Sequence, residues 1–255
     1  MKHLLLFISL LLFANLSQAQ YRKVLAVLQF DNLVNEVKPT YGTLEQPLES
    51  GAFINLMNPQ LRNVAFVRLF NSYRWPNGQK IDFSKRGSTK GGSKGIVDRY
   101  VLINPESSDT VLLYVDPYKT SDRYYVPKGM IVLTPAMLKE EIEPVLKQIE
   151  EINQAEEGSK LILHAGEVMR YVSTNFDQNK LIDNDKVKPL LEDKEIDKML
   201  AAYLMRSYIF SKYYALAKDV ENESDYAFEQ MKANFKKYMK LNPETNTGKL
   251  GEYLK

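Results

Sequence analysis

Short apolar runs bounded by turn residues dominate the first half of the chain. These runs are rich in Val, Ile, Leu, Phe and Tyr, which favours β-strands. The runs lie at 24–30, 64–70, 96–103, 110–115 and 130–133. The stretch 31–63 is interrupted by Pro and Gly, and we expect it to form loops and one short helix. The pattern therefore predicts a β-rich half over residues 20–134.

The clearest pair of predicted strands is Ile96–Ile103 with Thr110–Val115. The residues between them, 104–109, include Asn, Pro, Ser and Asp, which favour turns. This arrangement predicts an antiparallel hairpin over residues 96–115, in a mainly antiparallel sheet. Side chains of the second strand are apolar on both faces, and we expect both faces to be covered.

The pattern changes to a helical period at Thr134. Thr134 offers a hydroxyl cap, and Pro135 suits the first turn of a helix. Apolar residues then recur at spacings of three and four, at Leu138, Ile142, Val145, Ile149 and Ile152. This stripe predicts one helical face. Pro144 lies inside the stretch, where it removes a backbone hydrogen bond and predicts a kink or a break.

Three further helices follow from the same period. Residues 161–176 carry one apolar stripe, and 160–164 also fit a short strand. A helix is expected over about 192–220, with Tyr214 on its apolar side. A last helix is expected to begin at Ser224, to bury Phe228 and to end at Asn242–Pro243. Residues 135–255 should thus be all helical, which makes the fold class α+β, packed as one unit or as two domains.

The first 19 residues resemble a secretory signal peptide. Lys2 and His3 precede an uncharged run from Leu4 to Ala14, and Ser17 and Ala19 place small residues before the expected cut. The run is shorter than the 20 or so residues of a membrane-spanning helix, so an uncleaved anchor is disfavoured. We therefore expect cleavage after Ala19, no transmembrane segment in the mature chain, and a periplasmic or secreted protein.

Composition excludes several kinds of chemistry. The chain has no cysteine and two histidines, and removal of residues 1–19 would leave His164 alone. Disulfides, thiolate metal sites and Cys nucleophiles are thus excluded, and we expect no metal and no cofactor. Residues 20–134 carry 15 Lys or Arg against 10 Asp or Glu, whereas 135–255 carry 18 against 22. Neither balance is basic enough to indicate nucleic acid binding.

A basic, Gly-rich segment runs from Lys85 to Gly95. Two of its glycines have the spacing of a phosphate-binding loop, but the Lys and hydroxyl residues that should follow are out of order. The segment therefore fits a mobile polar connection between strands. Alternatively, Lys90 and Lys94 bind an anionic lipid, polymer or protein through their charge.

Residues 114–125 join two carboxylates, Asp116 and Asp122, to tyrosines that include Tyr118, Tyr124 and Tyr125. Paired carboxylates beside aromatic rings are typical of sugar cleavage, and aromatic loops are also typical of binding surfaces. Asp-Pro and Ser-Asp are equally typical of plain turns.

A further candidate pair consists of His164 and Glu167, which fit either acid–base chemistry or packing of the imidazole within its apolar stripe. The usual nucleophile motifs are absent from the chain. These patterns favour an exported, non-catalytic protein that binds another envelope protein or an anionic surface polymer through Tyr118, Tyr124, Tyr125, Lys90 and Lys94. The alternative is a glycan hydrolase in which Asp116 and Asp122 act as acid and base.

Overall fold

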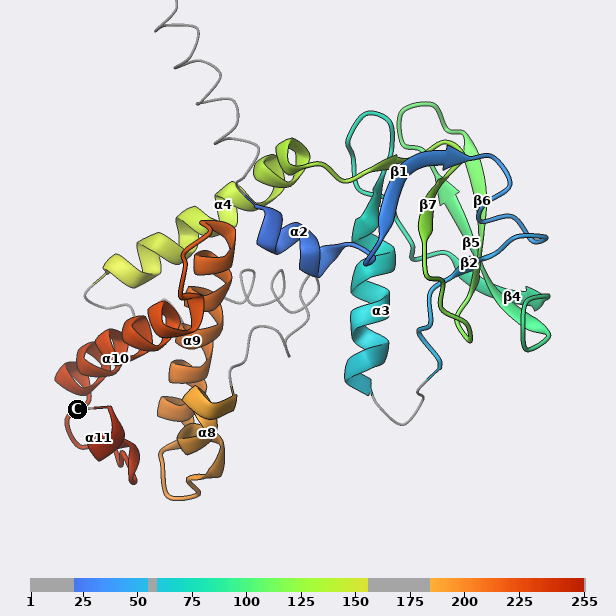
Figure 1. The fold of residues 1–255 in the computed structure, drawn as a ribbon. Helices are drawn as coiled ribbons and strands as arrows, with labels where there is room; N and C mark the ends of the chain where they lie inside the picture. Colours follow the sequence, from blue (N-terminus) through green and yellow to red (C-terminus); the bar gives the residue numbers. More distant parts are fainter. Residues whose placement is uncertain (1–20, 55–58, 156–183, 255) are drawn as a thin grey trace, which may run out of the picture. The chain divides into compact units, whose positions relative to one another are not determined.

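The structure is a computed structural model that describes residues 21–54, 59–155 and 184–254 (Figure 1). These residues divide into two units. The first contains 21–24 and the described residues from Leu138 onward, and the second runs from Leu25 to Met137. The expected signal peptide, the stripe at 161–176 and the pair His164 and Glu167 lie outside the described residues. The chain holds both strands and helices, most strands preceding most helices, which confirms the α+β class.

The unit 25–137 is built from three small sheets and one long helix. One sheet has four strands in the order β2-β6-β5-β4, and the pairs β1-β7 and β3-β8 form the other two. The strands are β1 (Leu33–Lys38), β2 (Leu48–Glu49), β3 (Tyr73–Arg74), β4 (Arg86–Lys90), β5 (Ile96–Ile103), β6 (Thr110–Asp116), β7 (Tyr124–Pro127) and β8 (Ile131–Val132). The helix is α3 (Pro59–Ser72), which packs into the same core through Leu69.

The predicted hairpin at 96–115 is confirmed. β5 and β6 pair antiparallel from Asp98 opposite Val115 to Ile103 opposite Thr110. β4 extends this sheet antiparallel to β5, and β3 pairs antiparallel with β8. The pairs β1-β7 and β2-β6 are parallel. The sheets therefore combine parallel and antiparallel pairs. Each parallel pair includes a strand, β1 or β2, from the stretch that the sequence predicts to be loops, so the mainly antiparallel prediction did not anticipate them.

The two faces of β6 have different surroundings. Leu113 and Val115 are buried in the core, which also holds Trp75 and Tyr100. On the other face, Leu112 remains 48% exposed. The prediction that both faces of this strand are covered is thus wrong for Leu112, because the outer face of the sheet has little apolar cover there.

Two of the predicted strands are helices. Residues 24–30 belong largely to α2 (Arg22–Leu28), and 64–70 lie within α3. In α2 the buried side chains are Val24, Val27 and Leu28, which are spaced at i, i+3 and i+4 as on one helical face. A short apolar run satisfies both periods, and the β-branched and aromatic residues wrongly favoured strands.

The first long helix of the second half begins, as predicted, directly after Thr134. Helix α4 (Pro135–Gln154) is continuous through Pro144, so the predicted break is absent. The Met137 N–H donates to the Thr134 hydroxyl at 3.4 Å, as expected of a cap. The buried stripe of α4 contains Leu146 where the sequence suggested Val145, and the remaining positions are those predicted.

The expected helix over 192–220 is two helices. α8 (Asn184–Glu192) ends before a short connection, and α9 (Lys198–Ala217) begins after Asp197. The Asp197 carboxylate accepts the N–H groups of Met199 and Leu200, at 2.8 and 3.0 Å, as an N-cap does. A new helix therefore begins here, and the single helix predicted from 192 is absent. Most of α9 is buried, but Tyr214, expected on its apolar side, is only half-buried.

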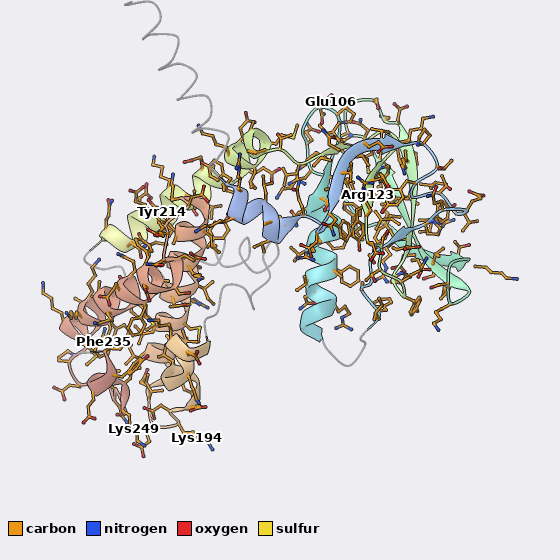
Figure 2. The ribbon with its side chains drawn as sticks, viewed as in Figure 1. Glu106, Arg123, Lys194, Tyr214, Phe235 and Lys249 are labelled. Carbon is orange, nitrogen blue, oxygen red and sulfur yellow. The ribbon has the colours of Figure 1, made fainter. Side chains whose placement is uncertain are left out.

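The fourth predicted helix is α10 (Glu223–Leu241), which packs against α9, and the short α11 (Leu250–Tyr253) follows it. α10 ends before Asn242 as predicted, but its N-cap is Asn222 rather than Ser224. Phe235, which Figure 2 labels, is buried as expected. Phe228 is only half-buried. Within the described parts of the chain, no helix has the length and hydropathy needed to cross a membrane.

Candidate functional site

The basic segment forms the end of a β-hairpin, and only its turn, residues 91–95, is a connection between strands. Its first part is strand β4, which pairs with β5 from Arg86 opposite Tyr100 to Lys90 opposite Ile96. The turn 91–95 closes this hairpin, with the Gly91 N–H donating to the Gly95 carbonyl at 3.2 Å. Lys90 and Lys94 are therefore held at the tip of a defined β-hairpin, so the mobile connection predicted from the sequence is wrong for residues 86–90.

Asp116 fastens this turn to the next loop. Its Oδ2 accepts the Ser93 N–H at 2.7 Å, and its Oδ1 accepts the Tyr118 N–H at 2.9 Å. The second bond is an Asx turn, which confirms that Asp116-Pro117 starts a turn. Gly92 allows the close approach, because a Cβ there would lie 2.8 Å from Asp116 Oδ2 and its φ is +65°. The basic turn and the loop that follows β6 are thus one connected structure.

An aromatic cluster, consisting of Phe53, Phe66 and Tyr118, lies beside the base of the hairpin. The Phe53 ring packs against Phe66 at 6.0 Å and against Tyr118 at 5.7 Å between centroids. The Arg86 guanidinium lies 5.5 Å from the Phe53 ring centroid and 5.6 Å from that of Phe66. These distances fit cation–π contacts, which orient the guanidinium along the cluster.

The buried Asp98 carboxylate anchors Arg86. Arg86 Nη2 donates to both Asp98 oxygens, at 3.0 and 2.8 Å. This pair neutralises one positive charge of the hairpin. Lys90 and Lys94 at the tip, and Arg99 nearer the base, remain exposed, and none of them makes an ion pair with another described residue. The exposed charge of the hairpin end is therefore positive.

The other predicted tyrosines lie elsewhere on the unit. Tyr124 is in the core, 6% exposed, and stacks on Phe30 at 4.0 Å between centroids. Tyr125 is half-buried, with Lys38 Nζ 3.4 Å from its ring centroid and Tyr41 packed edge-on at 5.7 Å. The structure thus brings Tyr118 close to the basic hairpin, whereas Tyr124 is a packing residue.

The carboxylates of the predicted catalytic pair have different environments. Asp116 is 3% exposed, and both of its oxygens accept backbone N–H groups. Asp122 is exposed farther along the same loop, next to Arg123 in the sequence. Neither lines the cleft described next. Asp116 therefore acts in the structure as a support for the loop.

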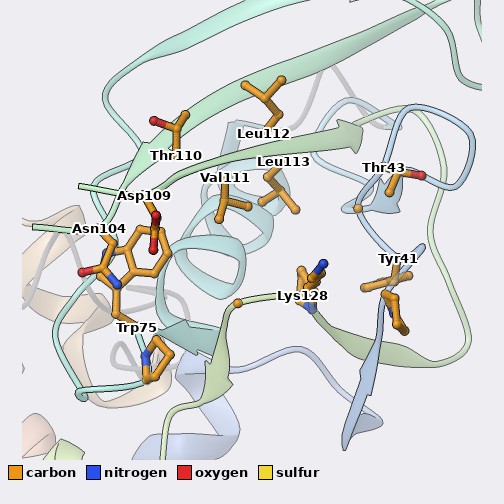
Figure 3. A pocket seen from close by; sticks show the side chains of 15 residues that line it. Tyr41, Thr43, Trp75, Asn104, Asp109, Thr110, Val111, Leu112, Leu113 and Lys128 are labelled. Carbon is orange, nitrogen blue, oxygen red and sulfur yellow. The ribbon is translucent and has the colours of Figure 1, made fainter. Parts of the chain in front are cut away.

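A cleft of about 440 Å³ lies along β6 on the same unit. Figure 3 shows Trp75, Asn104 and Asp109 at one end, and Lys128 and Tyr41 toward the other. Trp75 is 2% exposed, and its indole Nε1 has no hydrogen-bond partner among the described residues. Burial raises the pKa of Tyr41 above its ordinary value.

Sequence reasoning missed both the cleft and the aromatic cluster. Trp75 is the single tryptophan of the chain, and its position after a run taken for a strand gave no signal of a cleft. Phe53 lies in a stretch expected to be loop.

Among the described residues, no group of three or more His, Asp or Glu is arranged to hold a metal ion. No family model matches the chain, and neither curated proteins nor solved structures give a match.

Proposed function

We propose that the protein is an exported, non-catalytic binding protein of the cell envelope, and that the end of the β4-β5 hairpin binds an anionic surface polymer. The observation that carries this proposal is the positive hairpin end itself. Lys90, Lys94 and Arg99 are exposed on a hairpin whose turn is fixed by Asp116. The first 19 residues support export by their pattern.

Rigid presentation distinguishes this surface from scattered lysines. A backbone hydrogen bond closes the turn, and the Ser93 N–H is held by a buried carboxylate. Binding a polyanion then costs less conformational entropy than ordering a flexible loop. Tyr118 and the half-buried Phe53 add apolar surface beside the charges. A polymer with repeated acidic groups and sugar rings matches both features.

The contacts of Asp116 also support a binding role over hydrolysis. A glycosidase needs two carboxyl groups facing the scissile bond in a cleft. Asp116 instead has both oxygens engaged by backbone N–H groups, and Asp122 is exposed on a separate turn. The periplasmic or secreted location and an envelope protein as partner remain part of the proposal.

The test uses the mature full chain with dextran sulfate as the polyanion and neutral dextran as its uncharged match. The double variant Lys90→Gln/Lys94→Gln should weaken binding about tenfold, and binding should weaken as salt is raised. The control is Lys236→Gln/Lys240→Gln, which removes the same charge from exposed positions of α10. Equal binding by both double variants, or no binding to dextran sulfate at low salt, would overturn the polymer assignment.

Export has its own test. Mass spectrometry of the protein recovered from its native cells should find Gln20 at the N-terminus, because cleavage is expected after Ala19. Recovery of the chain from the cytosol with Met1 intact would overturn export without touching the binding measurement.

A further inference from the structure

One edge of β6 is only partly paired. On one side β6 pairs with β5 from Thr110 to Val115. On the other side β2 pairs only with Val115 and Asp116, and the Gly42 carbonyl accepts the Tyr114 N–H at 2.8 Å. Gly42 can come this close because its φ is +82° and a Cβ there would lie 2.5 Å from a Leu113 methyl group. Among the described residues, no strand neighbours the stretch before Tyr114 on this side.

The register shows which backbone groups face that open edge. The Val101 N–H donates to the Lys85 carbonyl on the β4 side, so Val101 points its backbone groups away from β6. Its antiparallel partner Leu112 must then point its own N–H and C=O away from β5, and so must Thr110 two residues earlier. Tyr114 fits the same alternation. The N–H and C=O groups of Thr110 and Leu112 are therefore at the open edge, and no other described residue bonds them there.

This edge borders the cleft that contains Trp75. Thr110 and Leu112 line the cleft together with the turn Pro127–Gly129, which follows β7 (Figure 3). Trp75, at one end, has a buried indole Nε1 without a hydrogen-bond partner among the described residues. Buried polar groups in folded proteins nearly always have partners. Because Nε1 itself is buried, the groups open to a ligand in the cleft are the backbone groups of Thr110 and Leu112 rather than the indole N–H.

We propose that the cleft binds an extended peptide segment of another protein, which adds a strand to the open edge of β6. The backbone groups of Thr110 and Leu112 recognise the peptide backbone, as in other cases of strand addition. The unpaired edge selects this occupant, because its donors and acceptors are spaced for a β-strand rather than for a sugar ring.

Opposite charges at the two ends of the cleft give a second reason for a peptide and set the charge that each end of the peptide should carry. Asp109 and Lys128 are both exposed at different ends of the cleft (Figure 3), and neither makes an ion pair with another described residue. A bound segment should thus carry a basic residue at the Asp109 end and an acidic residue at the Lys128 end. This site uses none of the hairpin lysines, so it goes beyond the polymer binding proposed above and stands or falls separately.

The first test needs no ligand. Amide hydrogen exchange of the full chain should show a fast-exchanging Leu112 N–H between slowly exchanging Val111 and Leu113 N–H groups, because those two face β5. Slow exchange at Leu112, comparable to that of its neighbours, would show that the edge is closed and would overturn the proposal.

The second test uses two synthetic peptides, acetyl-Lys-Thr-Val-Thr-Val-Glu-amide and its counterpart with Lys and Glu exchanged. One of the two should bind more tightly and should slow exchange at Leu112. Methylating the backbone nitrogens on the paired edge of that peptide should weaken binding about tenfold or more, whereas methylating the opposite edge should not. Failure of both peptides to bind at about 1 mM would overturn the proposal.

A protein variant gives the matching result. Leu112→Pro removes only the N–H at the open edge and leaves the β5 bonds, and proline is tolerated at strand edges. It should weaken the preferred peptide about tenfold, whereas the control Leu112→Val, which retains the N–H, should bind as the original does. Unchanged binding to a folded Leu112→Pro protein would overturn strand addition. Should that variant not fold, the methylated peptides decide, and dextran sulfate binding reports separately on the hairpin.

Discussion

The buried carboxylate of Asp116 offers a direct test of whether this residue supports the loop or performs chemistry. We predict that Asp116→Ala destabilises the unit 25–137, because it removes the acceptor for two backbone N–H groups, those of Ser93 and Tyr118. It also releases the basic turn from β6. Binding of dextran sulfate should fall with stability, since Lys94 follows Ser93 directly in the turn.

The magnitude follows from the two contacts. A hydrogen bond to a charged acceptor contributes about 1.5–3 kcal/mol. Ser93 is exposed, so water replaces part of its lost bond, and Tyr118 is half-buried. Asp116→Ala should therefore lower the free energy of unfolding by about 3 kcal/mol. Asp116→Asn keeps one carbonyl acceptor but turns an amide toward the second N–H, and should cost about 2 kcal/mol.

Urea unfolding followed by tyrosine and tryptophan fluorescence measures this loss. Trp75 reports on the unit 25–137, because the single tryptophan lies in its core. The matched control is Asp122→Asn, which changes an exposed carboxylate in the same loop and should alter stability by less than about 0.5 kcal/mol. Equal, small losses for both variants would refute the supporting role of Asp116 and would return catalysis to consideration.

Three further predictions concern single groups. Burial raises the pKa of Tyr100 to about 12, so folding favours its neutral form and stability should fall as pH rises from 10 to 12; Tyr100→Phe should reduce that loss in alkaline unfolding curves. Asp197→Ala removes the acceptor for two N–H groups of the first turn of α9 and should cost about 1 kcal/mol in urea unfolding. Backbone N–H donors lower the pKa of Asp193 below its ordinary 3.8, so its stabilisation is present above pH 3.8 and is lost as pH falls further. Asp193→Asn should flatten that acid limb in melting curves taken against pH, and an unchanged limb would count against the N–H donors.

The sequence predicted long periodic elements better than short apolar runs. Helix α4 begins after Thr134 as expected, because a cap, a first-turn proline and a stripe of five apolar positions agree. The hairpin at 96–115 also agrees, because its turn and both strands have matching signals. Residues 24–30 and 64–70 gave only an apolar run each, and such a run fits a strand or a helix until its partners are known.

The candidate site depended on contacts that no local pattern contains. The sequence singled out Lys90, Lys94, Asp116 and Tyr118 separately, and the structure joins them through the Ser93 N–H. Nothing in the sequence indicated the open edge of β6. Whether a strand edge is paired depends on the short strand β2, which lies in a stretch with the composition of a loop.

The two proposed sites bind by different physical means, and one variable therefore separates them. Polyanion binding at Lys90 and Lys94 depends on exposed charges, whose interactions are screened over roughly 10 Å at 0.1 M salt. Strand addition at Leu112 depends on backbone hydrogen bonds at a cleft, which salt screens far less. Raising salt should abolish dextran sulfate binding and leave most of the peptide affinity, with only the contribution of Asp109 and Lys128 lost. Parallel loss of both activities would mean that the peptide binds through charge alone and that the edge of β6 has no part in recognition.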